Sequence, residues 1–101
     1  MTDKKAILER AFFPIRPGTA AEFRGAFTKA RKLLEAAPGF QKLEMRQGIE
    51  EPDTFILLVW WDSVEAHMQG FRDSPAILEW RALLSPFFAG TPQMEHYEES
   101  L

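Results

Sequence analysis

Short apolar segments along the chain predict four strands. Residues 54–61 are apolar on both parities, which is typical of a strand covered on both faces, whereas residues 6–15 alternate imperfectly and predict a strand partly buried on both faces. Residues 40–47 instead alternate, with Leu43 and Met45 on one side and charged residues on the other, so a half-exposed strand is expected there. A short last strand is predicted over residues 93–98.

The clearest helix is predicted over residues 19–37. Its apolar residues recur at helical spacing and define one stripe: Phe23, Ala26, Phe27, Ala30, Leu33, Leu34 and Ala37. The sequence "TAAE" predicts a capping box, with Thr19 as N-cap and Glu22 three residues later. Pro38 and Gly39 then end the helix.

The segment "WWDSVEAHMQGFRDSPAILEWRALL" predicts two further, shorter helices. Asp62 or Ser63 is expected to cap the first, and Ser74 is expected to cap the second, with Pro75 in its first turn. Three- to four-residue spacing places several side chains of the first helix on one face: Val64, His67, Met68 and Phe71. The apolar side of the second is expected to include Ile77, Trp80, Leu83 or Leu84, and Phe87.

This order of elements, β-α-β-β-α-β, predicts a ferredoxin-like α+β fold over residues 1–101, with an antiparallel four-stranded sheet and the helices on one face. Such a sheet leaves its second face uncovered in a monomer. Because residues 55–61 are apolar on both parities, we expect a second copy to cover that face, which predicts a homodimer. The many aromatic residues also indicate a cavity for a small apolar or aromatic ligand.

Composition narrows the class of protein. The formal net charge is −3, which argues against a nucleic-acid partner. The chain has no cysteine, and the apolar run 55–61 is too short to cross a membrane, so a cytoplasmic protein is expected. Two histidines 29 positions apart favour no metal site, and no nucleotide fingerprint is present; we therefore expect no metal and no cofactor.

His67 is the main candidate for chemistry, with two interpretations. It can be a core histidine that bonds to the backbone, or an acid, base or hydrogen-bond donor in an aromatic cavity. A functional His67 is expected to bond to protein through one ring nitrogen and to face the cavity with the other. His96, on the last predicted strand, is expected to be structural or to lie at an interface.

The segment "LLVWWDSVEAHMQGFRDSPAILEWRALLSPFF" resembles the antibiotic biosynthesis monooxygenase domain family. The resemblance is carried by Trp61, by "S-x-E-A-H" ending at His67, and by Ser74 and Pro75, and the closing "P-x-x-x-H-Y-E" from Pro92 to Glu98 also fits. It implies a homodimeric α+β barrel with a small-molecule cavity in each subunit. Family members oxidise polycyclic phenols without a cofactor, degrade haem, or act on other small molecules.

Departures from the family pattern narrow the implied activity. Haem-degrading relatives use an asparagine on the first strand and a histidine on the last helical segment, and this chain has no asparagine, while residues 76–84 contain Trp80 and no histidine. The resemblance therefore argues against haem degradation. The polycyclic-phenol oxygenases also use an asparagine and a tryptophan near the second helix, so their machinery does not carry over intact. The first hypothesis is a cofactor-independent oxygenase of a phenol or quinol, with His67 as base or anion partner. A binding or dimerisation protein is the alternative. The expected cavity lining is Phe23, Phe27, Trp61, Phe71, Trp80 and Phe87.

Overall fold

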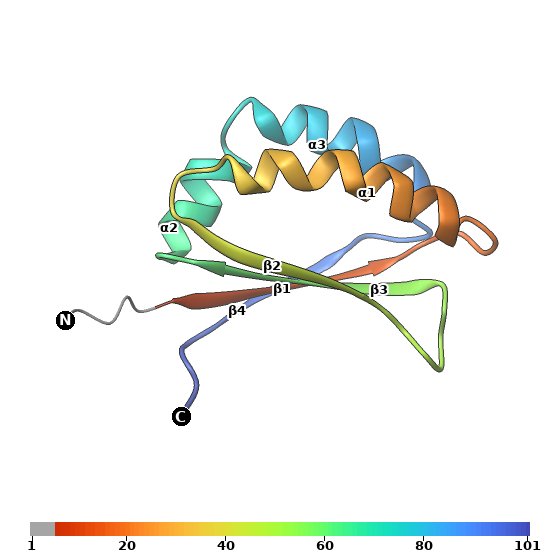
Figure 1. Cartoon of the computed structure of the whole chain (residues 1–101), viewed down its shortest axis with the longest axis horizontal. Helices are drawn as coiled ribbons and strands as arrows, with labels where there is room; N and C mark the ends of the chain where they lie inside the picture. The colour runs from red at the N-terminus through yellow and green to blue at the C-terminus, as the bar shows by residue number, and fades with distance from the viewer. Residues whose placement is uncertain (1–5) are drawn as a thin grey trace.

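The computed structural model describes residues 6–101, and it confirms the ferredoxin-like α+β architecture. The elements are β1 (Ile7–Pro14), α1 (Ala20–Glu35), β2 (Phe40–Gln47), β3 (Thr54–Trp61), α2 (Val64–His67), the π-helical turn η1 (Met68–Arg72), α3 (Ala76–Leu84), the 3₁₀ turn η2 (Ser85–Phe87) and β4 (Gln93–Tyr97). The strands form one antiparallel sheet in the order β2-β3-β1-β4. All helices cover one face of it (Figure 1).

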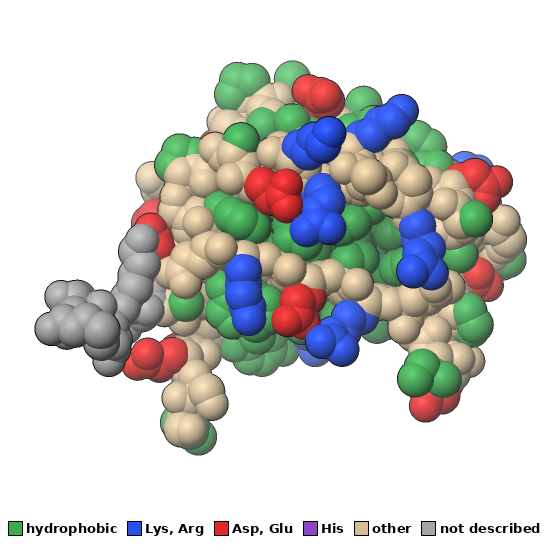
Figure 2. Space-filling model, viewed as in Figure 1, with side chains coloured by type: hydrophobic (Ala, Val, Ile, Leu, Met, Phe, Trp, Pro, Cys, Tyr) green, Lys and Arg blue, Asp and Glu red, His purple; other side chains and the backbone are tan. Residues whose placement is uncertain are grey.

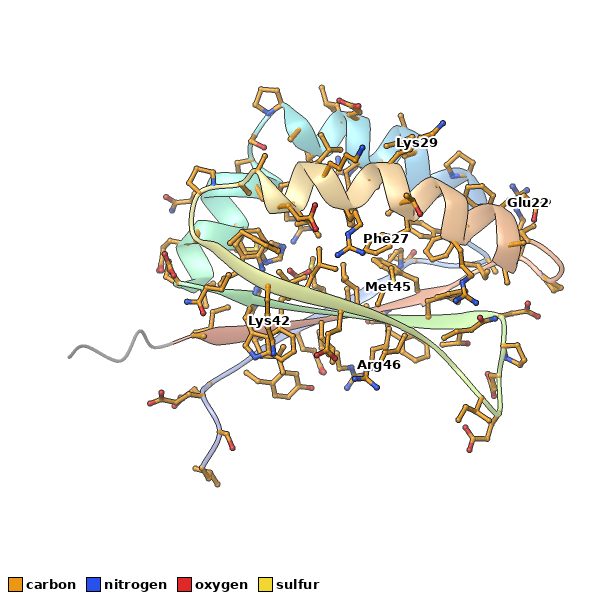
Figure 3. All side chains as sticks on the ribbon, in the orientation of Figure 1. Glu22, Phe27, Lys29, Lys42, Met45 and Arg46 are labelled. Carbon is orange, nitrogen blue, oxygen red and sulfur yellow. The ribbon has the colours of Figure 1, made fainter. Side chains whose placement is uncertain are left out.

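The core lies between that face and the helices. Alternate residues of β1 and β3, such as Phe13, Leu57 and Val59, are buried against the apolar stripe of α1. Figure 3 shows Phe27 and Met45 in the space between α1 and the sheet, whereas Lys42 and Arg46 project from the opposite face. The period of two along each strand thus separates a helix-covered face from an open one.

The open face of the sheet carries apolar side chains on its two central strands, with Arg10 between Leu8 and Phe12. Strand alternation places five half-buried side chains there: Leu8 and Phe12 from β1, and Ile56, Leu58 and Trp60 from β3. Charged side chains flank them on β2, where the Nζ atom of Lys42 lies 4.4 Å from the centroid of the Trp60 ring. We call these five residues the outer apolar face.

Two local capping predictions were wrong. Thr19 makes no capping bond to α1, because its hydroxyl instead donates to the Arg16 carbonyl oxygen at 2.7 Å. Ser74 likewise donates to the Phe71 carbonyl oxygen at 2.6 Å, and α3 begins after Pro75 without a side-chain cap. The cap predicted for the first short helix is confirmed in one of its two forms: Ser63, and not Asp62, accepts the capping bond from the Ala66 amide.

The shared helical face was only partly predicted. His67 and Phe71 are buried, but Val64 is exposed. The helix also widens after His67 into the π turn η1, which regular helical spacing does not anticipate. This turn places Phe71 and Arg72 beside the cavity described next.

Candidate active site

A cavity of about 330 Å³ lies between the sheet and the last helical segments. β1 and β4 form its floor, and η1, α3 and the loop after α3 form its opposite wall. Most of its lining is apolar or aromatic. The lining residues are Glu9, Ala11, Phe13, Leu34, Leu57, His67, Phe71, Arg72, Ile77, Trp80, Arg81, Ser85, Phe88, Thr91, Pro92 and Met94. The volume is at the small end of the range for ligand pockets.

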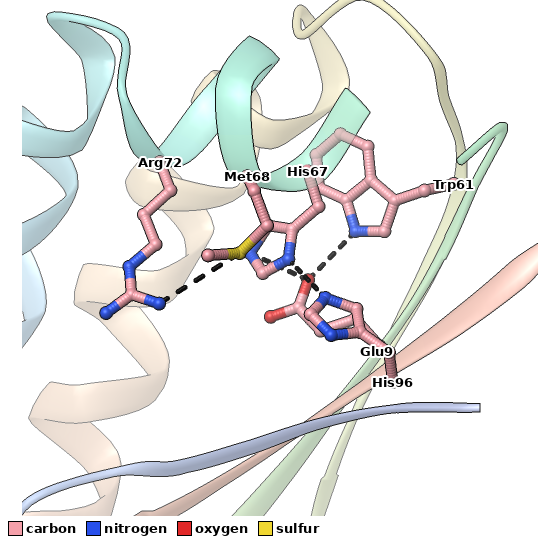
Figure 4. Close-up of polar contacts among 6 residues, drawn as sticks. All are labelled: Glu9, Trp61, His67, Met68, Arg72 and His96. Atoms are coloured by element: carbon pink, nitrogen blue, oxygen red, sulfur yellow. Dashed lines mark hydrogen bonds and ion pairs between the residues drawn. The ribbon is translucent and has the colours of Figure 1, made fainter. Parts of the chain in front are cut away.

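Glu9 is the unusual group in this lining. Its side chain projects from β1 toward the helices, on the same side of the strand as Ala11 and Phe13, and it is 4% exposed. Trp61 donates from Nε1 to Glu9 Oε1 at 2.9 Å, and His67 Nε2 lies 3.4 Å from the same oxygen. The second carboxylate oxygen points away from Trp61, toward the side on which Arg72 lies (Figure 4).

His67 is held on both sides of its ring. Its Nδ1 lies 2.8 Å from His96 Nε2, and its ring stacks on Trp61 with centroids 5.3 Å apart. The expectation that one nitrogen faces the cavity freely was wrong, since both contact protein side chains. Those partners are themselves titratable, so the contacts form a chain from Glu9 through His67 to His96 (Figure 4).

The pairing register of β1 with β4 explains why the side chains of Glu9, His67 and His96 meet. Glu9 and His96 are directly paired residues of β1 and β4, so both project toward the helices. Serine capping at the start of α2 then presents His67 above them, where it is 3% exposed. A histidine 29 residues away in the sequence thus becomes its neighbour through strand pairing.

Burial reverses the usual order of the pKa values of Glu9 and His67, so that the pKa of the carboxyl group lies above that of the imidazole. It raises the pKa of Glu9 to about 7, against the smaller lowering effects of the Trp61 hydrogen bond and the Arg72 charge. It lowers the pKa of His67 to about 4, with the charges of His96 and Arg72 contributing. Burial therefore favours an uncharged imidazole and a carboxyl group that titrates near neutral pH.

Of the predicted lining residues, Phe71 and Trp80 border the cavity. Trp61 lies behind its wall and bonds to Glu9, and Phe87 packs edge-on against Phe23. Phe23 and Phe27 border a second hollow, between α1 and β2. Figure 2 shows apolar side chains in that region of the surface, with lysine and arginine side chains around them.

The sequence prediction missed Glu9, Arg72 and Arg81 as cavity-lining residues, and it expected His96 to be structural or to lie at an interface. Glu9 could have been found, because it shares strand parity with Ala11 and Phe13, and a carboxylate on a core-facing parity is rare unless it is paired. Within residues 6–101 no group of three or more histidine, cysteine, aspartate or glutamate side chains is arranged to hold a metal ion. No described helix is both long enough and apolar enough to cross a membrane.

Comparisons with known proteins place the chain in a family. The model of the antibiotic biosynthesis monooxygenase family matches residues 6–83, which include Glu9 and His67 but not His96. The uncharacterised protein YczJ of Bacillus subtilis is 33% identical over 93 residues, covering 92% of this chain and 98% of that protein.

Solved structures agree with this match. A Bordetella bronchiseptica protein named after the same family superposes with a TM-score of 0.92 at 35% identity, covering 96% of this chain and 99% of its own. SnoaB from Streptomyces nogalater, a cofactor-independent oxygenase, superposes with a TM-score of 0.79 at 15% identity and covers 98% of this chain and 96% of its own. At that identity SnoaB shows a common fold alone.

Proposed function

The chain belongs to the antibiotic biosynthesis monooxygenase family, and from this premise we propose that it is a cofactor-independent oxygenase of a phenol or quinol. One observation carries the proposal: the Glu9–His67–His96 chain borders an apolar, aromatic-lined cavity. A buried group whose pKa is about 7 is suited to remove and return a proton near neutral pH.

In the proposed reaction the hydroxyl of the bound ligand donates its proton to the carboxylate of Glu9. The phenolate carbon para to that oxygen, which carries a hydrogen atom, bonds to dioxygen and forms a peroxide, which takes the proton back from Glu9. Loss of the ring C–H proton with cleavage of the O–O bond then releases water and leaves a quinone carbonyl. The ligand supplies all four electrons that dioxygen accepts, so no further reductant is needed.

His67 and His96 support Glu9 in this scheme. The Nε2 atom of His67 lies 3.4 Å from the Glu9 carboxylate, and its Nδ1 atom lies 2.8 Å from His96 Nε2. The two histidines thus hold a neutral polar group beside Glu9. The apolar lining excludes water from the reacting anion. His67 is thus a positioning residue, and Glu9 is the group that meets the ligand.

Oxygen uptake tests this proposal. Purified protein is offered a panel of naphthols and polyphenols whose para ring position carries hydrogen, under labelled dioxygen, with the buffer rate subtracted. We expect uptake with at least one compound, one labelled oxygen atom in its product and one in water. A panel in which no compound raises uptake above the buffer rate contradicts the proposal.

A non-catalytic small-molecule-binding protein is the second candidate. It is favoured by His67, whose two nitrogens both contact protein, as in a histidine that only fills a core. Under this alternative, panel compounds bind in the cavity at micromolar concentrations, but their presence leaves oxygen uptake at the buffer rate.

A further inference from the structure

Two arginines that border the cavity differ from all others in the described chain. Arg10, Arg31 and Arg46 each pair with a glutamate, at 3.6, 3.0 and 2.9 Å respectively. Arg24 donates to Gln47 Oε1 at 3.0 Å, and Arg16 donates to the carbonyl oxygen of Pro86. Within residues 6–101, Arg72 reaches only the Met68 sulfur, at 4.0 Å, and Arg81 has no hydrogen bond or ion pair.

Both arginines lie on the helical wall of the cavity. Arg72 is the last residue of the π turn η1, and Arg81 lies one residue after Trp80 on α3. Both are exposed, so their guanidinium groups remain hydrated at the cavity rim while the interior is apolar. The sole carboxylate in the lining is the buried Glu9.

A guanidinium group binds a carboxylate through paired hydrogen bonds, and a free one at the mouth of an apolar cavity selects ligands that carry an anion. The aromatic side chains inside the cavity, among them Phe71, Trp80 and Phe88, select a flat ring. A singly charged carboxylate suits this cavity better than a doubly charged phosphate, because Glu9 also ionises within it.

We propose that the ligand is an aromatic carboxylic acid whose ring lies in the cavity and whose carboxylate binds Arg72 and Arg81 at its rim. This inference rests on the proposed function in one respect: a hydroxyl group on the same aromatic ring is placed at Glu9. Arg72 and Arg81 then determine specificity: they distinguish an acid from its neutral ester or parent phenol.

Binding without oxygen separates this inference from the proposed reaction. The probes are a hydroxynaphthoate with its hydroxyl and carboxylate on opposite rings, the methyl ester of that acid, and naphthol. Affinities are measured by calorimetry under nitrogen for the unmodified chain and for Arg72→Gln, Arg81→Gln and Arg24→Gln. Arg24 is the matched control, because it borders the second hollow instead of the cavity.

We expect the acid to bind at least tenfold more tightly than the ester or naphthol. Each of Arg72→Gln and Arg81→Gln should weaken binding of the acid by about tenfold, in keeping with the loss of one charged hydrogen bond, and leave binding of the ester unchanged. Arg24→Gln should have no effect. Circular dichroism of each variant confirms that it is folded.

The inference is overturned if the ester binds as tightly as the acid, if none of the probes binds, or if Arg24→Gln alone weakens the acid. Oxygen uptake with neutral phenols would leave the proposed function intact in those cases. Conversely, tight binding of the acid through Arg72 and Arg81 without oxygen uptake in air supports this inference and contradicts the oxygenase.

Discussion

Glu9 and His67 together keep one bound proton across the mildly acidic range. The pKa of Glu9 rises from 4.5 to about 7, so folding favours its protonated form; the pKa of His67 falls from 6.5 to about 4, so folding favours its neutral form. In the unfolded chain the pair also holds one proton over this range, on the histidine. The two effects on the free energy of unfolding therefore cancel between about pH 4.5 and 6.5.

Single substitutions should expose opposite pH slopes. In Glu9→Gln only His67 remains, and because the unfolded chain then binds more protons, stability should rise with pH from about 4 to 6.5. In His67→Gln only Glu9 remains, and because the folded chain binds more protons, stability should fall as pH rises from about 4.5 to 7. Each slope should reach up to about 1.4 kcal/mol per pH unit.

Urea denaturation at several pH values measures these slopes for the two variants and the unmodified chain. The variants serve as controls for each other, since any pH dependence from the rest of the protein is common to both. Parallel curves for both variants would show that Glu9 and His67 are not a coupled buried pair.

At the level of elements, the junction between α1 and β2 holds α2 in place. Gly39 has φ +84°, and a Cβ there would lie 2.6 Å from Ala66 Cβ, one residue before His67. The Asp62 amide also donates to the Gly39 carbonyl oxygen at 2.8 Å. This close approach therefore couples the start of β2 to the helix that carries His67.

Gly39→Ala should lower the free energy of unfolding by about 1–3 kcal/mol, because it combines backbone strain with a clash. Gly25→Ala is the matched control, since Gly25 lies within α1 with no atom near its Cβ position, and this change should raise stability by roughly 0.5–1 kcal/mol. Thermal melts measure both. Equal effects of the two changes would mean that the contact with Ala66 is unimportant.

Hydrophobic spacing predicted the strands well and the site poorly. The bounds of residues 40–47 and 54–61 agree with β2 and β3, because alternation and two-sided apolarity report directly on sheet burial. The π turn after His67 was not predicted, because Phe71, four positions after His67, fits the spacing of an α-helix equally well. The contact of His67 with His96 depends on the register of β1 with β4, which no local pattern contains.

For the whole molecule, the outer apolar face supports the proposed homodimer. Leu8, Phe12, Ile56, Leu58 and Trp60 occupy the centre of a sheet face that no helix covers. Apolar surface removed from water stabilises an assembly by about 25 cal/mol per Å². Association of two such faces would bury these side chains and leave both cavities intact on the opposite sides.

Leu58→Glu should convert the dimer to a monomer at micromolar concentration, because it replaces the apolar side chain between Arg10 and Glu44 by a carboxylate that the partner would have to bury. Ile49→Glu is the control: Ile49 is 89% exposed in the β2–β3 turn, so this change should leave the dimer unaffected. Light scattering gives the mass of each. A monomeric unmodified chain at the same concentration would contradict the proposed assembly.

The central claim is that Glu9 exchanges a proton with a phenolic ligand during oxygenation. Its most direct test is the rate of oxygen uptake between pH 5 and 9, with the best panel compound, for the unmodified chain and Glu9→Gln. The rate of the unmodified chain should rise as pH passes about 7, because Glu9 then ionises. Glu9→Gln should be slower by about 10²–10⁴-fold and lack this rise. Equal rates and pH profiles for the two proteins would contradict the claim.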